Sequence, residues 1–121
     1  MWPFSKIDNS GPRYRTIHPN FAIAGQISVD DIPRLAEAGF KTIVCARPDG
    51  EEPGQPTFAI IAAAARKAGL KAVHIPVSGG IGEGQLIRME RAVKSLPTPM
   101  LGYCRSGARA GSLFSAAQSL A

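Results

Sequence analysis

The sequence predicts a three-layer α/β fold, in which a mainly parallel central sheet of about four to five strands carries helices on both faces. Two observations lead to this fold class. Strand-like and helix-like segments alternate in about four units along the chain, a pattern typical of parallel strands joined by helical crossovers. The run Thr42-Ile-Val-Cys45 is β-branched and apolar, as expected for a strand buried on both faces.

The elements follow in order along the chain. Residues 1–13 are interpreted as a flexible leader, because they lack the apolar core of a secretory signal, and 14–121 as one domain. Apolar periodicity predicts the strands, and capping residues, glycines and prolines bound most of the helices. The strands are expected at 14–25 (an edge pair), 40–46, 71–77 and 99–103. The helices are expected at 28–39, 57–68, 85–96 and 110–120.

Composition and charge argue against several classes of protein. The net charge is +5, from fourteen Lys and Arg against nine Asp and Glu. These basic residues are scattered through every segment, so we expect no nucleic-acid partner. The charge is either a solvated surface or a field that steers anionic substrates. The longest apolar run, 58–65, is too short to span a bilayer, and no membrane partner is expected.

The two cysteines, Cys45 and Cys104, form neither a disulfide framework nor a metal signature. We therefore expect no metal and no cofactor, and a reducing, cytoplasmic location in which a reactive thiol survives. Cys45 lies inside a predicted strand and is interpreted as a small core residue. His18 and His74 are interpreted as structural. The glycine-rich run 78–84 is expected to form a mobile wall of a pocket, because it lacks the patterns of nucleotide-binding loops.

The run Cys104-Arg-Ser-Gly-Ala-Arg109 joins the last predicted strand to the last predicted helix. Backbone N–H groups of such a loop converge, and the helix dipole adds about half a positive charge. These conditions lower a thiol pKa from about 8.5 into the range ~3.5–7.5. Cys104 is the predicted nucleophile, and Arg109 is predicted to clamp two oxygens of an anion. The residues between them are predicted to bind the substrate: Arg105, Ser106, Gly107 and Ala108.

A second loop, Arg47-Pro-Asp-Gly-Glu-Glu-Pro-Gly-Gln55, follows the strand at 40–46. If the sheet is parallel, this loop and the Cys104 loop meet at the edge where ligands bind in open α/β sheets. Asp49 is predicted as the general acid for the leaving group, ahead of Glu51 or Glu52. The alternative is a turn with solvated glutamates. Arg47 either binds the substrate or pairs with these carboxylates, and the sequence leaves both roles open.

The motifs together resemble known cysteine enzymes. Four residues separate Cys104 from Arg109, one fewer than in the cysteine-dependent phosphatases and similar to a rhodanese persulfide loop. The runs Ala24-Gly-Gln-Ile-Ser28, 47–55 and Ile75-Pro-Val77 resemble a bacterial family, the phosphatase-like domain of β-lactamase-hydrolase-like proteins, which carries this short loop on a dual-specificity-phosphatase-like scaffold. The resemblance covers about residues 14 to 120 and implies one phosphatase-like catalytic domain over 14–121.

The chain departs from related dual-specificity enzymes at two points. Ser78-Gly-Gly80 follows the Ile-Pro-Val strand where many relatives carry an acidic Asp, which leaves Glu83 as another choice of acid. Ala110 follows the loop arginine where many relatives carry a hydroxyl group that stabilises the leaving thiolate. The sequence therefore supports anion binding more strongly than it supports catalytic turnover.

Three functions therefore stay open. The first is a hydrolase of phosphomonoesters that uses a Cys104 thiolate and Arg109. The second is a rhodanese-like sulfurtransferase with a Cys104 persulfide. The third is a non-catalytic module that binds or senses an anion. The expected partner is an anionic small molecule or a phosphorylated substrate. The last helix ends without a further element to cover its face, which leaves a homo-oligomer, or a trimmed parent chain, as an option.

Overall fold

The structure, a computed structural model, describes residues 12–120, so most of the leader predicted over 1–13 lies outside the described residues. One sheet of five strands has the order β1-β2-β5-β3-β4. The strands are β1 (Tyr14–His18), β2 (Phe21–Ala24), β3 (Thr42–Cys45), β4 (Lys71–His74) and β5 (Met100–Tyr103). The edge strand β1 is antiparallel to β2, and all other neighbours are parallel. The predicted edge pair and the mainly parallel sheet are confirmed.

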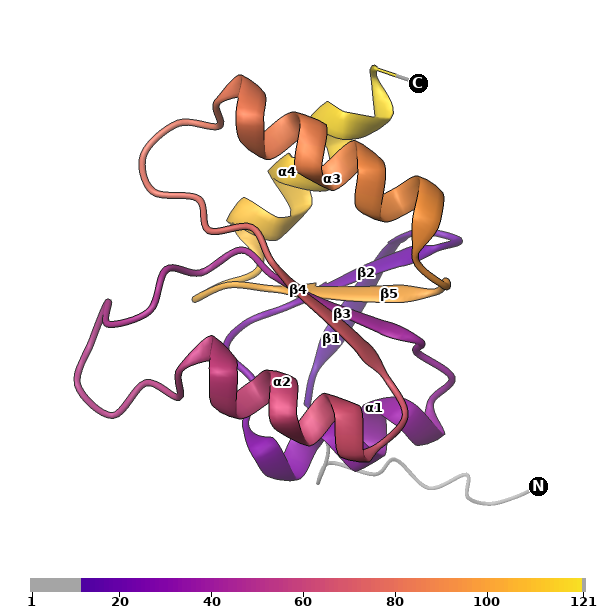
Figure 1. Cartoon of the computed structure of the whole chain (residues 1–121), viewed down its shortest axis with the longest axis vertical. Coiled ribbons are helices and arrows are strands. Elements are labelled where there is room, and N and C mark those ends of the chain that lie inside the picture. The colour runs from indigo at the N-terminus through magenta and orange to yellow at the C-terminus, as the bar shows by residue number, and fades with distance from the viewer. Residues whose placement is uncertain (1–11, 121) are drawn as a thin grey trace.

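Helices cover both faces of this sheet, which confirms the three predicted layers (Figure 1). A short 3-10 turn and helices α1 and α2 lie on one face, and α3 and α4 lie on the other. In the part of the chain described, no helix is long and apolar enough to cross a bilayer. The bounds are η1 (Val29–Asp31), α1 (Ile32–Glu37), α2 (Phe58–Lys67), α3 (Glu83–Ser95) and α4 (Ala108–Gln118).

The core has two halves, one on each face of the sheet. Successive residues of β3 alternate between them, since side chains of a strand point to opposite faces. Ile43 and Cys45 pack in the half under α1 and α2, whereas Val44 packs with Cys104 under α3 and α4. Cys45 is therefore a core residue, as predicted, and it belongs to the opposite half of the core from Cys104.

The end of the fourth strand and the two histidines differ in how well they were anticipated. The fourth strand was expected to reach residue 77 but ends at His74, although the N–H groups of Ile75 and Val77 still donate to the carbonyl oxygens of Cys45 and Ala46 at 2.8 and 2.9 Å. His74 stacks on Phe58 with ring centroids 4.7 Å apart, and its Nε2 lies 2.8 Å from the Arg47 carbonyl oxygen. The Nδ1 of His18 accepts the N–H of Asn20 at 3.0 Å. Both histidines thus make the structural contacts expected of them.

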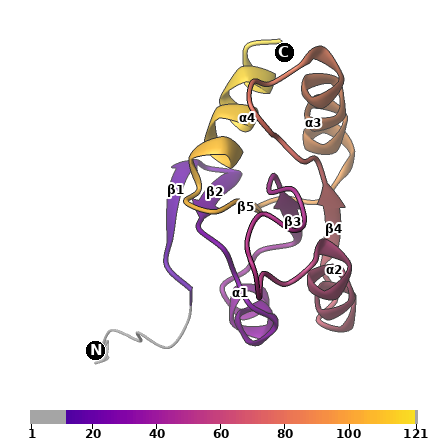
Figure 2. The ribbon, with the colours of Figure 1, turned by 90° about the vertical axis from the view of Figure 1, so that its left-hand side faces the viewer.

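The parallel strands place four connecting loops at one edge of the sheet. Figure 2 looks onto this edge, where the chain leaves β2, β3, β4 and β5. The acidic loop after β3 and the cysteine loop after β5 are neighbours there, because β3 and β5 pair directly. The shared edge predicted for the two loops is therefore present.

Candidate active site at the carboxyl edge of the sheet

Cys104 is the first residue after β5 and is fully buried at the base of its loop. Its N–H donates to the carbonyl oxygen of Ala24 at 3.3 Å, which fixes the loop to the end of β2. The loop then turns back, and the N–H of Gly107 donates to the Cys104 Sγ at 3.0 Å. Gly107 has φ 97°, a left-handed conformation that favours glycine. The reversal directs the N–H groups of the loop toward the sulfur.

These N–H groups favour the thiolate form of Cys104. Burial by itself would raise the pKa of the thiol. The backbone N–H groups of Ala110, Ser106, Arg109 and Gly107 outweigh burial and hold the pKa of Cys104 below its ordinary value of 9.0. The position at the start of α4 adds the positive end of the helix dipole. Cys104 thus lies in the environment that the sequence predicted for a nucleophile.

Arg109 lies in the first turn of α4 and is held from two sides. Its Nη1 and Nη2 donate to the two carboxylate oxygens of Glu51 at 2.7 and 2.8 Å. Nη1 also donates to the carbonyl oxygen of Val77 at 2.9 Å. Glu51 first, and then the Cys104 sulfur, raise the pKa of Arg109. The guanidinium has five donors, so Nε and one Nη2 hydrogen stay outside these bonds, on the edge available to an anion.

Glu51, which the sequence placed with Glu52 behind Asp49 as a candidate acid, lies at the centre of the charge network. Arg109 and Arg47 both donate to its carboxylate, which lowers its pKa from 4.5 to about 2. Such a carboxyl is ionised at neutral pH and has no proton to give. The ion pairs thus argue against the general-acid role considered for Glu51, and they hold Arg109 in place. The shared sheet edge was the one signal in the sequence that could have suggested this pairing.

Arg47 is buried, with 2% of its side chain exposed, and each of its three side-chain nitrogens donates to a protein group. Nε donates to Glu51 at 2.8 Å, Nη2 to Glu52 at 2.7 Å, and Nη1 to the side-chain oxygen of Gln26 at 2.9 Å. Burial by itself would lower the pKa of Arg47, but Glu52 and Glu51 raise it. Of the two roles left open, the structure shows the pairing with carboxylates. The substrate-binding role of Arg47 stays a prediction.

Asp49 lies at the start of α2. Its Oδ1 accepts the N–H of Phe58 at 2.8 Å, one of the helix N–H groups that lack a partner within the helix. This contact gives the carboxylate a capping role. The acid role for Asp49 stays a prediction. Glu52 is held by Arg47 and, more weakly, by Arg105, which lower its pKa.

The remaining predicted substrate-binding residues surround the mouth of the loop. Arg105 is exposed, with its Nε 3.9 Å from Glu52. Ser106 accepts the N–H of Ala108 on its Oγ at 3.3 Å. Gly107 is buried, whereas Arg105, Ser106 and Ala108 are exposed. The three exposed residues thus lie in the same loop as Cys104 and Arg109.

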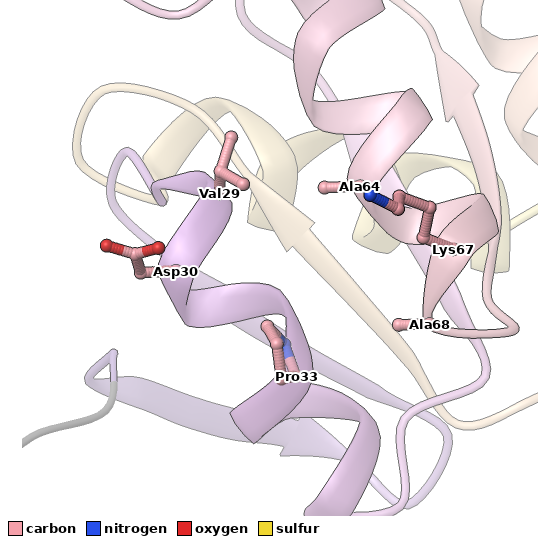
Figure 3. A pocket seen from close by; sticks show the side chains of 6 residues that line it. All are labelled: Val29, Asp30, Pro33, Ala64, Lys67 and Ala68. Carbon is pink, nitrogen blue, oxygen red and sulfur yellow. The ribbon is translucent and has the colours of Figure 1, made fainter.

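One surface hollow lies beside Arg109, and a second lies away from the cysteine loop. One, of about 350 Å³, adjoins Arg109 and is walled by Gly79 and Gly80, so the glycine-rich run forms the predicted wall. Another, of about 470 Å³, lies between η1–α1 and α2 on the far side from the cysteine loop, and its charged lining is Asp30 and Lys67 (Figure 3). Within residues 12–120, no group of three or more His, Cys, Asp or Glu side chains could hold a metal ion.

The fold and the strand–loop–helix junction together define a phosphatase-like α/β domain. The chain belongs to the family described as beta-lactamase hydrolase-like protein, phosphatase-like domain, which matches residues 13–121. A beta-lactamase hydrolase-like protein of Agrobacterium fabrum is 40% identical over 99 residues, which cover 81% of this chain and 23% of that protein. This chain thus spans less than a quarter of the length of that relative.

Solved structures agree with this assignment. The structure of a candidate phosphatase from Neisseria meningitidis is 32% identical with a TM-score of 0.75, and the match covers 83% of this chain and 72% of that one. The core catalytic domain of the PP-IP phosphatase SIW14 from S. cerevisiae, in complex with citrate, shares the fold. Its TM-score is 0.68 at 21% identity, over 91% of this chain and 67% of that one. The family and the dual-specificity-phosphatase-like fold implied by the sequence resemblance are confirmed.

Proposed function

We propose that this domain hydrolyses phosphomonoesters through a phosphocysteine formed on Cys104. One observation carries the proposal: the Cys104 sulfur accepts the Gly107 N–H at 3.0 Å and its pKa lies below the ordinary value of a thiol. A thiolate held in this way is a nucleophile at neutral pH. The neighbouring Arg109 is held by Glu51 and Val77, which leaves one edge of its guanidinium for phosphate oxygens.

The reaction has two steps. In the first, the Cys104 thiolate attacks phosphorus, the S–P bond forms, and the bond to the leaving oxygen breaks. The loop N–H groups and Arg109 stabilise the negative charge on the other oxygens as it develops. In the second, water attacks phosphorus and loses a proton to solvent, the S–P bond breaks, and phosphate leaves as the thiolate is restored.

Protonation of the leaving oxygen limits the substrates that the domain can cleave. Arg109 and Arg47 keep Glu51 ionised, and Asp49 accepts the N–H of Phe58. Aryl phosphates need little help from an acid, because their leaving oxygens are weak bases. The hydrolase proposal therefore rests on Cys104 and Arg109, and aryl phosphates are the substrates with which to test it.

The loop length favours a second candidate, a sulfurtransferase. With four residues between Cys104 and Arg109, the loop suits a cargo smaller than phosphate. The Cys104 thiolate would attack the outer sulfur of thiosulfate, the S–S bond would break, and sulfite would leave. Cyanide would then take the outer sulfur of the persulfide as thiocyanate and restore the thiolate. An anion-binding module without turnover is the third candidate.

A parallel assay separates these functions. We expect wild-type protein to cleave p-nitrophenyl phosphate, vanadate to inhibit the cleavage, and Cys104→Ser to abolish it. Cys45→Ala is the matched control, since Cys45 is the other cysteine and lies in the opposite half of the core. Thiocyanate formation from thiosulfate and cyanide, with a Cys104 adduct of the mass of one sulfur atom, would replace the hydrolase by the sulfurtransferase. If neither reaction occurs while phosphate protects Cys104 from alkylation, the domain binds anions only.

A further inference from the structure

A hollow of about 330 Å³ lies beside the cysteine loop, on the side of the edge strand β1. Its lining includes Ala24 and Gly25, where the chain leaves β2, and Ser106 of the cysteine loop. Arg13 and Arg15, at the start of β1, also line it. We call this hollow the β1 subsite. It has no part in the chemistry assigned to Cys104 and Arg109.

Two residues in the wall of the β1 subsite are in direct backbone contact with the loop that carries Cys104. The carbonyl oxygen of Ala24 accepts the N–H of Cys104 at 3.3 Å. At Gly25, a Cβ atom would lie only 2.9 Å from the carbonyl oxygen of Arg105, so the two segments are in close backbone contact. The cysteine loop and the β1 subsite are therefore fixed relative to each other.

The antiparallel pairing of β1 brings two arginines to this edge. Tyr14 pairs with Ala24, so the start of β1 lies at the carboxyl end of β2. Arg13 directly precedes β1 and Arg15 is its second residue, so the two flank Tyr14, and both line the hollow. The ring of Tyr14 meets that of Phe40 edge to face. Both arginines are exposed.

The charge of these two arginines is not neutralised by the acidic loop. Glu51 pairs with Arg47 and Arg109, and Glu52 pairs with Arg47 and lies near Arg105. Over residues 12–120, neither arginine of the β1 subsite takes part in an ion pair. The edge of the sheet thus carries two positive charges beyond those that the glutamates engage.

We propose that the β1 subsite binds a second phosphate group of the substrate. The inference rests on the proposed function and narrows its substrate class to phosphomonoesters that carry another phosphate. Two arginines that line one hollow provide paired N–H donors, which match the oxygens of a phosphate. With one phosphate held over Cys104, the second would pass Ser106 and reach Arg13 and Arg15.

The test compares alkanediol bisphosphates with the matching monophosphates, with linkers from ethane to hexane. Binding to Cys104→Ser protein, which cannot form the phosphocysteine, is measured by isothermal titration calorimetry. We expect one linker length to favour the bisphosphate about tenfold, as for a charge-assisted contact. Adding Arg13→Ser and Arg15→Ser should remove this preference. Adding Arg91→Ser, which deletes an exposed arginine of α3, should preserve it. The preference should also weaken as NaCl is added.

Two results would overturn the β1 subsite: no preference for a bisphosphate at any linker length, or a preference that survives the loss of both arginines. Circular dichroism checks that each variant is folded. Arg13→Gln alone is a milder variant, which should halve the logarithm of the preference for the bisphosphate over the monophosphate. Wild-type turnover of p-nitrophenyl phosphate tests the proposed function separately. If that turnover is absent while the bisphosphate preference depends on Arg13 and Arg15, the hydrolase fails and the subsite stands.

Discussion

Replacing Gly107 by alanine should have two separable effects, a loss of stability and a rise in the pKa of Cys104. Gly107 has φ 97°, and a left-handed conformation costs an alanine about 1–2 kcal/mol. The new Cβ would also lie 3.3 Å from the carbonyl oxygen of Ala24, so the loop must shift by a few tenths of an ångström. That shift moves the N–H that now lies 3.0 Å from the Cys104 sulfur.

The size of the pKa change follows from this hydrogen bond. A hydrogen bond to a charged group contributes about 1.5–3 kcal/mol, and one pKa unit corresponds to about 1.4 kcal/mol. Loss of the Gly107 contact should therefore raise the pKa of Cys104 by about one to two units. Gly69→Ala is the matched control. Gly69 has φ 84° with no atom within 4 Å of an added Cβ, so this variant should lose similar stability and leave Cys104 unchanged.

Two measurements on the same variants decide the matter. The rate of alkylation of Cys104 by iodoacetamide is followed across pH in a Cys45→Ala background, and urea unfolding gives the change in stability. We expect the alkylation profile to move to higher pH for Gly107→Ala alone. If both glycine variants lose the same stability and Cys104 titrates identically in each, the N–H of Gly107 does not stabilise the thiolate. The low pKa of Cys104 would then depend on the N–H groups of Ala110, Ser106 and Arg109 alone.

Further predictions concern the acidic loop. Glu51→Gln should lower kcat/KM for p-nitrophenyl phosphate by about tenfold to a hundredfold, because Arg109 loses its charged partner and its position; an unchanged value would exclude this positioning role. Asp49→Asn keeps an oxygen for the Phe58 N–H, so we expect little change in stability and in the rate with aryl phosphates, whereas Asp49→Ala should lose about 0.5–2 kcal/mol of stability. A fall of about 10²–10⁴ for Asp49→Asn with alkyl phosphates would establish Asp49 as the general acid. The pKa of Glu51 is lower in the folded state than its ordinary value, so the ionised carboxylate stabilises the fold fully above pH 4.5, and this stabilisation is lost as the pH falls toward about 2. Between these pH values, the free energy of unfolding measured with urea should depend less on pH for Glu51→Gln than for the wild type.

Much of the fold could be predicted because it depends on local patterns. The buried strand at β3 is an apolar β-branched run, and α2 is bounded by Thr57, whose Oγ1 accepts the N–H of Ile60, and by Gly69. Errors occur at the ends of elements. The clearest case is β4, which was expected to reach residue 77 and stops at His74, although Ile75 and Val77 still donate to carbonyl oxygens of Cys45 and Ala46.

The site was predictable down to its loops but not to its ion pairs. Parallel strands bring the Cys104 loop and the acidic loop to one edge, and that follows from topology alone. Which carboxylate meets which arginine depends on side-chain conformations across a separation of 58 residues. Asp49 was assigned the acid role from its place in the acidic loop, and the structure adds a contact with the first N–H of α2. Glu51, ranked below it, holds Arg109.

The ion pairs also bear on the choice between phosphate and sulfur chemistry. The thiolate of Cys104 and the held Arg109 would serve either reaction, so they do not separate the two. Sulfur transfer from thiosulfate needs a single small anion, and Arg13 and Arg15 would then have no ligand. A substrate with two phosphates would use both the cysteine loop and the β1 subsite, and would engage the positive charge that Glu51 and Glu52 leave unpaired. The distribution of arginines at this edge thus favours phosphoester hydrolysis, although the length of the loop favours sulfur transfer.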